Sequence, residues 1–267
     1  MKRIIKLLSV LLILSFVLVA CKNESSELTK IKVGVSPVPH AEIVEGLKEE
    51  FKKEGLDVEV VVFSDYVQPN IALDEGDIDL NYFQHEPYLK EFSESRNLNL
   101  VNIGAIHLEP MGFYSDKIKS FDELRDGDEI LIPNDPTNNT RALRLLEDAG
   151  LIKLEDHDAE AITEKDIKEN PKNLKITAVD ASTVAKAYAD VAGGVINSNF
   201  ALGAGLNPKE DTLFVEKTEN NPNANIIAVK AENKDNENYK KFVKVLQSEK
   251  AREFINEKYD GTVIPAF

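Results

Sequence analysis

The sequence predicts an α/β protein that is divided into two lobes. Short runs of β-branched residues alternate with helical stripes of apolar residues from position 31 to the C-terminus. Strands that alternate with helices are typical of an α/β fold with mostly parallel sheets. The chain has 267 residues, of which 42% are hydrophobic, so it is long and apolar enough to bury a substantial core.

Two turn-rich breaks predict where the lobes meet. The first lies at 107–112 (HLEPMG) and the second at 219–225 (ENNPNAN), and both contain the residues that favour turns. Only one strand and two helices follow the second break, which is too little for a domain, so we expect them to return to the first lobe. Lobe one is therefore predicted at 31–107 plus 226–267, and lobe two at 112–222, with two crossover segments between them.

The individual elements follow from the spacing of the apolar residues. Short apolar runs predict strands at 31–35, 58–63, 98–106, 129–132, 174–179, 194–196 and 225–229. Apolar residues three and four positions apart predict helices at 43–51, 86–96, 137–149, 182–190 and 236–246. The segment 79–88 is expected to follow a short strand and to lead into a helix.

The N-terminus has the organisation of a bacterial lipoprotein signal. Three basic residues precede an uncharged run at 7–20, which is shorter than the roughly 20 residues of a membrane span. The run ends in LVAC, which resembles the lipobox where the signal is cleaved and the cysteine is lipid-modified. We predict a signal peptide at 1–20, lipidation of Cys21 and a lipidated tether at 21–30. An ordinary signal or a short anchor with a chance cysteine is the alternative.

Charge and cysteine content exclude several classes of function. The chain carries 47 acidic and 32 basic residues, a net charge of -15, which disfavours nucleic-acid binding. Its single cysteine excludes an internal disulfide, a Cys-rich zinc site and two-thiol redox chemistry. The common hydrolase, zinc-protease and nucleotide-binding signatures are absent from the sequence, so we predict neither an enzyme nor a cofactor.

Aromatic side chains are placed where an α/β protein binds ligands. Phe83 and His85 lie in the segment 79–88, and Tyr66 follows the strand at 58–63. Side chains at the carboxyl ends of strands in an open sheet face the ligand crevice. We expect about half of the aromatic side chains in 79–88 to lie in the core, and Tyr66 to lie beside the rest.

Arg141 lies near the start of a predicted helix, after the strand at 129–132. Asp135 can cap this helix and Pro136 suits its first position. One interpretation is that backbone N–H groups and the guanidinium together hold a carboxylate. The equal alternative is an exposed arginine paired with Glu147 or Asp148.

Two asparagines occupy corresponding positions in lobe two and at the second crossover. Asn197 follows the strand at 194–196, and Asn225 begins the strand at 225–229. Asparagines at strand ends are most often turn formers. Polar residues on three unrelated segments that face one crevice nevertheless indicate a binding site.

Blocks of sequence along the mature chain resemble those of one family. The sequence resembles the methionine-binding lipoproteins of the NlpA/MetQ type, which serve ABC importers, through VGVSPVPHAEI, DYVQPNIAL, GDIDLNYFQHEPYL, PNDPTNNTRAL, VINSNFA and NANIIAV. The resemblance implies a two-lobe periplasmic-binding-protein fold of type II that closes around a free amino acid, L-methionine or a related one. It also implies a lipid anchor on the extracytoplasmic face of the cell membrane, and an importer permease and ATPase complex as partners.

The resemblance assigns roles to individual positions. It places Tyr66, Phe83 and His85 around the ligand side chain. It places Arg141 on the ligand carboxylate, and Asn197 and Asn225 on the backbone groups of the ligand. An arginine suits a carboxylate and aromatic rings suit a thioether. The sequence departs from the family in lacking a glycine before Arg141 and in carrying Gly193 and Gly194 where bulkier residues are expected.

Three other functions remain as alternatives. The first is a metal-binding (zinc or manganese) importer lipoprotein that uses His40, His85 and His107, with Glu86 or Glu109 as further ligands. That site would leave Arg141 facing a cation. The second is a secreted amino-acid hydrolase with His85 and a serine. The third is an adhesin role, which could coexist with transport.

Overall fold

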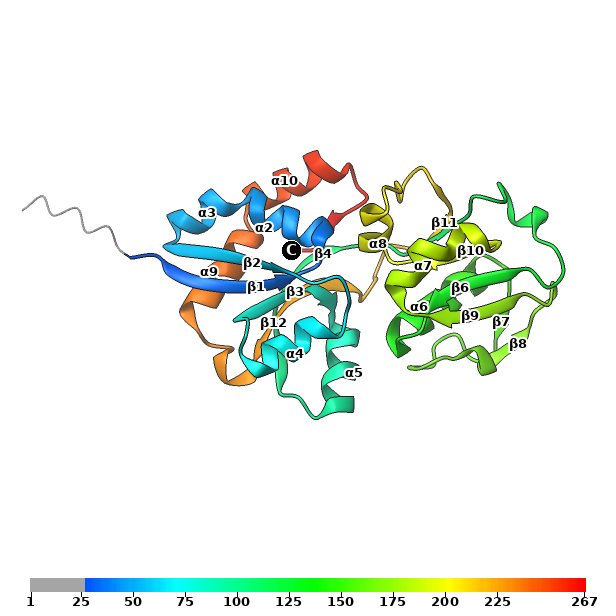
Figure 1. Ribbon diagram of the computed structural model, residues 1–267, viewed down its shortest axis with the longest axis horizontal. Coiled ribbons are helices and arrows are strands. Elements are labelled where there is room, and N and C mark those ends of the chain that lie inside the picture. The colour runs from blue at the N-terminus through cyan, green and yellow to red at the C-terminus, as the bar shows by residue number, and fades with distance from the viewer. Residues whose placement is uncertain (1–26) are drawn as a thin grey trace, which may run out of the picture.

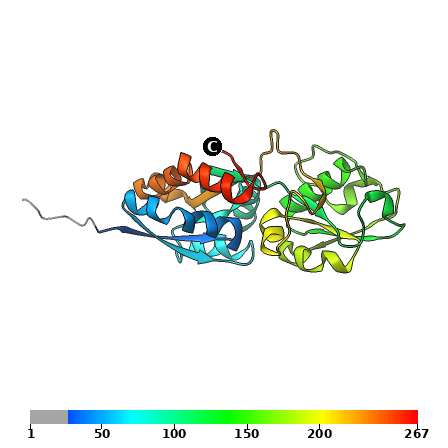
Figure 2. The same ribbon diagram turned by 90° about the horizontal axis from the view of Figure 1, so that it is seen from above.

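The computed structural model describes residues 27–267 and is drawn in Figure 1. The predicted signal peptide, Cys21 and most of the predicted tether lie outside the described residues. Within residues 27–267, no helix has the length and apolar content needed to cross a membrane. Figures 1 and 2 show two α/β lobes that lie side by side along the longest axis of the molecule. The predicted two-lobe α/β fold is confirmed.

The sheet of lobe one contains strands from both ends of the chain. Its order is β13-β4-β12-β3-β1-β2, and its strands are β1 (Thr29–Val35), β2 (Leu56–Val62), β3 (Leu80–His85), β4 (Leu100–Leu108), β12 (Ala224–Lys230) and β13 (Ile264–Pro265). Its helical elements are η1 (Pro37–Ala41), α2 (Glu42–Gly46), α3 (Lys48–Lys53), α4 (Gln68–Glu75), α5 (Glu86–Arg96), α9 (Glu237–Leu246) and α10 (Glu249–Tyr259). The C-terminal strands and helices therefore pack with the N-terminal ones.

The sheet of lobe two has the order β11-β5-β10-β6-β9. Its strands are β5 (Gly112–Tyr114), β6 (Glu129–Pro133), β9 (Lys175–Val179), β10 (Gly193–Ile196) and β11 (Thr212–Val215), with a separate hairpin of β7 (Lys153–Leu154) and β8 (Ile167–Glu169). Its helices are α6 (Pro136–Asp148), α7 (Ala181–Ala187) and α8 (Ser198–Gly203). Short 3-10 turns are η2 (Phe121–Glu123), η3 (Glu164–Asp166), η4 (Tyr188–Asp190) and, in lobe one, η5 (Ala231–Asn233).

Both sheets are covered by helices on their two faces, which explains their apolar strands. In β12, Ile227 and Val229 join the core beneath α2, α9 and α10, whereas Ile226 and Ala228 join the core beneath α4 and α5. This division follows from the two-residue period of a strand. Because their side chains are buried on both faces, such strands do not show the alternation of apolar and polar residues in the sequence.

The prediction of mostly parallel sheets is wrong, because both sheets are mixed. In lobe one, β1 is parallel to β2 and β3, but β12 is antiparallel to both β3 and β4. In lobe two, β6 is parallel to β9 and β10, whereas β5 is antiparallel to β10 and β11. The reason lies in the crossovers: β4 carries the chain out of lobe one and β12 brings it back beside β4, so the two run in opposite directions.

The segment 79–88 also differs from its prediction. It was expected to follow a strand, but residues Leu80–His85 are themselves strand β3, and every side chain in this strand is buried. The strand ends at His85, whose ring accepts the backbone N–H of Tyr88 and caps α5. Of the segment's aromatic side chains, Tyr82 packs in the main core of lobe one, whereas Phe83 and Tyr88 form a separate cluster beside Tyr66.

Candidate functional site

A small cavity lies between the two lobes. The six residues predicted from the sequence all line it: Tyr66, Phe83, His85, Arg141, Asn197 and Asn225. The other lining residues are Gln84, Tyr88, Glu109, Asn138, Ser198 and Asn199. Residues from both lobes and from both crossovers therefore meet in one space.

One wall of the cavity is aromatic. The ring of Tyr66 lies 5.9 Å from those of Phe83 and Tyr88, and 4.9 Å from that of Phe200 on helix α8 of lobe two. Phe83 and Tyr88 come from β3 and α5, so these rings are fixed by packing within lobe one. The wall is suited to an apolar ligand side chain, and to sulfur in particular, because sulfur interacts favourably with ring edges.

His85 is held in a neutral form at this wall. Its Nδ1 accepts the N–H of Tyr88 at 3.1 Å, and its Nε2 lies 3.2 Å from Oδ1 of Asn138 in lobe two. Burial and the nearby Arg141 lower the pKa of His85 to about 3. Because the ring is uncharged at neutral pH, it contributes a hydrogen bond between the lobes and no positive charge.

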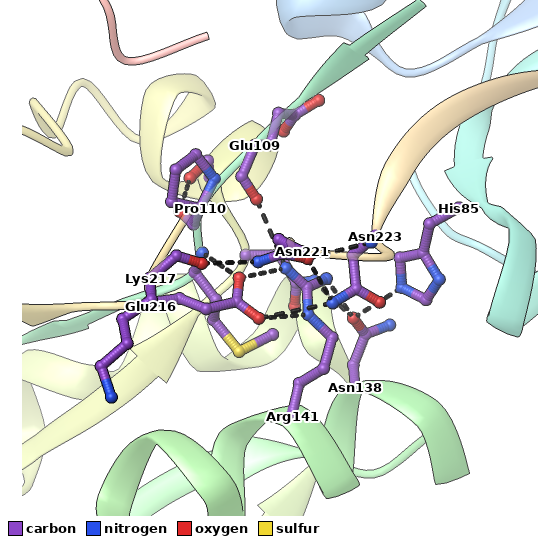
Figure 3. Close-up of polar contacts among 12 residues, drawn as sticks. His85, Glu109, Pro110, Asn138, Arg141, Glu216, Lys217, Asn221 and Asn223 are labelled. Carbon is purple, nitrogen blue, oxygen red and sulfur yellow. Dashed lines mark hydrogen bonds and ion pairs between the residues drawn. The ribbon is translucent and has the colours of Figure 1, made fainter. Parts of the chain in front are cut away.

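Arg141 is buried and forms an ion pair with Glu216 (Figure 3). Its Nη2 lies 2.6 Å from Oε2 and its Nε 3.1 Å from Oε1 of Glu216, whereas Nη1 donates to Oδ1 of Asn138 at 3.2 Å. The alternative of an exposed arginine paired with Glu147 or Asp148 is wrong, because Glu147 pairs with His157 and Asp148 pairs with Lys217.

The start of helix α6 differs from the expected anion site. The carboxylate of Asp135 accepts the backbone N–H of Asn138 at 3.0 Å, so the protein's own side chain already occupies this N-cap position. The same carboxylate also accepts from the side-chain amide of Asn138, whose Nδ2 lies 3.0 Å from each of the two carboxylate oxygens. The predicted convergence of this helix terminus and Arg141 on one ligand carboxylate is therefore not formed.

Four asparagines present amide groups to the cavity. The Oδ1 of Asn138 accepts from Nδ2 of Asn197 at 2.9 Å, in addition to its contacts with His85 and Arg141. Among the described residues, the buried Oδ1 of Asn197 and Nδ2 of Asn199 have no hydrogen-bond partner. A buried polar atom without a partner is costly, so one acceptor and one donor remain for a ligand.

The residues of the predicted metal site are only partly brought together. His40, His107 and Glu109 converge, with 3.3 Å and 2.7 Å from the two Nε2 atoms to Oε1 of Glu109. His85 faces Asn138 instead, and Glu86 is exposed. Burial lowers the pKa of His40 to about 4 and that of His107 to about 3.

This histidine cluster also bonds to its surroundings. Nε2 of His40 lies 2.9 Å from Oδ1 of Asn225, and Nδ1 of His107 contacts the hydroxyl of Tyr82. Glu109 belongs to the first crossover and Asn225 to the second. The hydrogen bonds of the cluster therefore connect both crossovers to lobe one.

Sequence reasoning missed Asn138 and Glu216. Asn138 precedes Arg141 by three positions, which places both on one face of α6, so the helical period could have indicated it. Glu216 lies 75 positions after Arg141, in the segment FVEKTEN, where a single acid carries no signal of its partner. Long-range pairing of this kind is visible only in the folded chain.

Comparisons with known proteins cover both lobes. The family profile described as NlpA lipoprotein matches residues 31–267. The chain is 44% identical over 256 residues to the D-methionine-binding lipoprotein MetQ of Salmonella typhi, covering 95% of this chain and 94% of that protein. It is 44% identical over 265 residues to the methionine-binding lipoprotein MetQ of Bacillus subtilis, covering 96% of each. A nutrient binding protein from Burkholderia cenocepacia, solved bound to methionine, superposes with a TM-score of 0.86 at 43% identity, over 89% of this chain and 100% of that one.

Proposed function

Because the chain belongs to the NlpA lipoprotein family, we propose that it is the substrate-binding lipoprotein of an ABC importer and that its substrate is methionine. The observation that carries the proposal is the single cavity in which a buried arginine, two unpaired amide atoms and an aromatic wall meet. These are the groups required by a carboxylate, an ammonium and an apolar side chain. The names of the relatives, which bind methionine, support the same substrate.

Each end of the ligand has a partner in the cavity. Arg141 receives the carboxylate, together with Nδ2 of Asn225, whose Oδ1 is taken by His40. Oδ1 of Asn197 accepts from the ammonium, since it has no partner within the described residues. Tyr66, Phe83 and His85 enclose the thioether, which gains about 0.3–1.5 kcal/mol beside a ring.

The protein acts by binding rather than by catalysis. Both ring nitrogens of His85 are occupied by Tyr88 and Asn138, so this residue is not a free base. Glu109 lies within 2.7 Å of His107 and 3.3 Å of His40 rather than beside a nucleophile. The contacts are those of a receptor that holds a ligand unchanged.

The location and partners follow from the anchor. A lipid on Cys21 would hold the two lobes at the extracytoplasmic face of the membrane, where an integral permease and its ATPase receive the ligand.

The metal alternative has one supporting observation, the convergence of His40, His107 and Glu109. Two features favour methionine over it. His85 and Glu86 do not join the cluster, and the relatives of this chain are named for methionine rather than for a metal.

The proposal is tested by identifying the bound cargo. The mature protein is purified without added amino acids, denatured, and the released small molecules are analysed by mass spectrometry. We expect methionine in near-stoichiometric amount. Release of a different class of molecule, or of zinc with no amino acid, would contradict the proposal.

A further inference from the structure

Groups of the protein itself occupy most of the hydrogen-bonding capacity of Arg141. A guanidinium has five N–H donors. Two of them face the Glu216 carboxylate, one reaches the carbonyl oxygen of Glu109 at 3.4 Å and one reaches Asn138 (Figure 3). Within residues 27–267, one N–H, on Nη1, is left without a partner. Because Nε and Nη2 of Arg141 already bind the two oxygens of Glu216, the ligand carboxylate does not form a bidentate pair with this edge of the guanidinium.

The carboxylate of Glu216 is itself held by both crossovers. Its Oε2 accepts the N–H of Met111 at 3.1 Å in the first crossover, and its Oε1 lies 3.4 Å from Nδ2 of Asn223 in the second. Its backbone N–H donates to the carbonyl of Met111 at 2.8 Å. Glu216 is only 17% exposed. It is thus a fixed partner of Arg141 rather than a surface acid that happens to lie near it.

The ion pair changes the charge that a ligand meets. Burial opposes the charged form of Glu216, yet Arg141 and the N–H of Met111 hold its pKa below the ordinary value. The pair is therefore ionised on both sides, and its net charge beside the cavity is zero. An incoming carboxylate without an ammonium would add an uncompensated negative charge to a buried space, which is costly. A zwitterion brings its own compensating charge.

We propose that Glu216 is a specificity-determining residue, which holds and neutralises Arg141 so that the cavity selects zwitterionic amino acids over simple carboxylates. This inference rests on the proposed function, because it concerns the ligand of the same cavity. It assigns Glu216 a role through Arg141 and no contact with the ligand.

The test compares two ligands that differ only in the ammonium: L-methionine and its 2-hydroxy analogue, 2-hydroxy-4-(methylthio)butanoate. Calorimetry gives the Kd of each for wild type and for Glu216→Gln. Removal of the negative charge leaves Arg141 uncompensated, so the ratio of the analogue's Kd to that of methionine should fall at least tenfold. A ratio within twofold of wild type would overturn the inference, since a merely structural role weakens both ligands equally.

Two further variants separate charge from geometry. Glu216→Asp keeps the charge but withdraws it from Arg141, so both ligands should weaken while their Kd ratio stays within twofold of wild type. Glu169→Gln removes an exposed carboxylate that pairs with Lys153 within lobe two and should leave both affinities unchanged. A tenfold fall of the ratio in Glu169→Gln would overturn the inference, because any lost charge would then suffice.

A measurement on wild type alone keeps the inference testable even where Glu216→Gln does not fold. Wild type should bind methionine at least 100 times more tightly than the hydroxy analogue. Equal binding of the two within threefold overturns the inference and leaves the proposed function intact. Binding of neither ligand by stripped wild-type protein contradicts the proposed function itself.

Discussion

Tyr66 of lobe one donates a hydrogen bond to Asn199 of lobe two, with 2.5 Å between the phenolic oxygen and Oδ1. A second bond between the lobes joins His85 to Asn138 at 3.2 Å. Both bonds require the lobes to be in contact, so they belong to the closed arrangement of the cleft. A ligand that binds only this arrangement shifts the population toward it by its differential affinity.

The Tyr66 hydroxyl should therefore affect closure for every ligand alike. Tyr66→Phe removes one hydrogen bond of about 0.5–1.5 kcal/mol and keeps the ring. We expect methionine, norleucine and alanine to weaken by a similar factor in calorimetry, roughly 2- to 12-fold. Tyr239→Phe is the matched control, because its hydroxyl bonds Asp79 within lobe one, and it should bind as wild type does. A loss confined to methionine would mean that the hydroxyl contacts the ligand instead.

Phe83 should discriminate between ligands by their side chains. Phe83→Ala deletes a ring of the aromatic wall, so a long ligand loses buried area and the sulfur–ring contact, whereas alanine loses little. We expect methionine to lose about 1–2 kcal/mol more than alanine does. Norleucine, which lacks the sulfur, separates the two contributions. Equal losses for all three ligands in calorimetry would refute the assignment of this wall to the side chain.

Acid should destabilise the protein through its buried histidines. The pKa values of His85, His107 and His40 lie near 3, 3 and 4 in the folded chain, against about 6.5 unfolded. Between roughly pH 6.5 and 4 the unfolded chain binds more protons, so the free energy of unfolding falls as the pH falls.

The expected loss between pH 7 and pH 5 is about 1–2 kcal/mol for each of these histidines. Glu109 and Asp135 work in the opposite direction, because burial raises their pKa values. Urea unfolding at the two pH values measures the difference, and His85→Gln should reduce it. A free energy of unfolding that rises between pH 7 and pH 5 would show that the acids dominate instead.

Attachment to the membrane should depend on Cys21 alone. Cys21→Ser removes the acceptor of the lipid, and stable anchoring needs more than one acyl chain. We expect the variant to move from the membrane fraction to the soluble fraction after cell lysis. Retention of the variant in membranes after an alkaline wash would contradict the lipobox interpretation.

Much of the cavity lining is predictable because the residues proposed to bind the ligand lie near the ends of strands. Phe83 and His85 lie in the second half of β3 and Asn197 follows β10, and the carboxyl ends of strands in an open α/β sheet face the crevice. Strand β3 itself was missed, because a strand buried on both faces shows no alternation. The orientation of β12 was missed as well, since apolar period does not encode strand direction.

Packing explains why the chain carries a glycine at position 193, where the resemblance to the family leads one to expect a bulkier residue. A Cβ on Gly193 would lie 2.6 Å from the ring of Phe113 and 2.7 Å from the carbonyl oxygen of Tyr114. Gly193 therefore makes room for Phe113 in the core of lobe two, and it does not line the ligand cavity. The pairing of Glu216 with Arg141 is likewise not predictable from the sequence, because the two residues are 75 positions apart.

The proposed ligand binding depends most on Arg141, and one titration tests the role of this residue directly. Stripped and refolded wild type and Arg141→Ala are titrated with L-methionine by calorimetry. Loss of the guanidinium leaves the ligand carboxylate unpaired and should cost about 2–5 kcal/mol, so the Kd should rise roughly 30-fold or more. Arg144→Ala, on the same helix but bonded to His157 outside the cavity, should bind as wild type does. An Arg141→Ala affinity within about threefold of wild type, roughly 0.7 kcal/mol, would contradict the account.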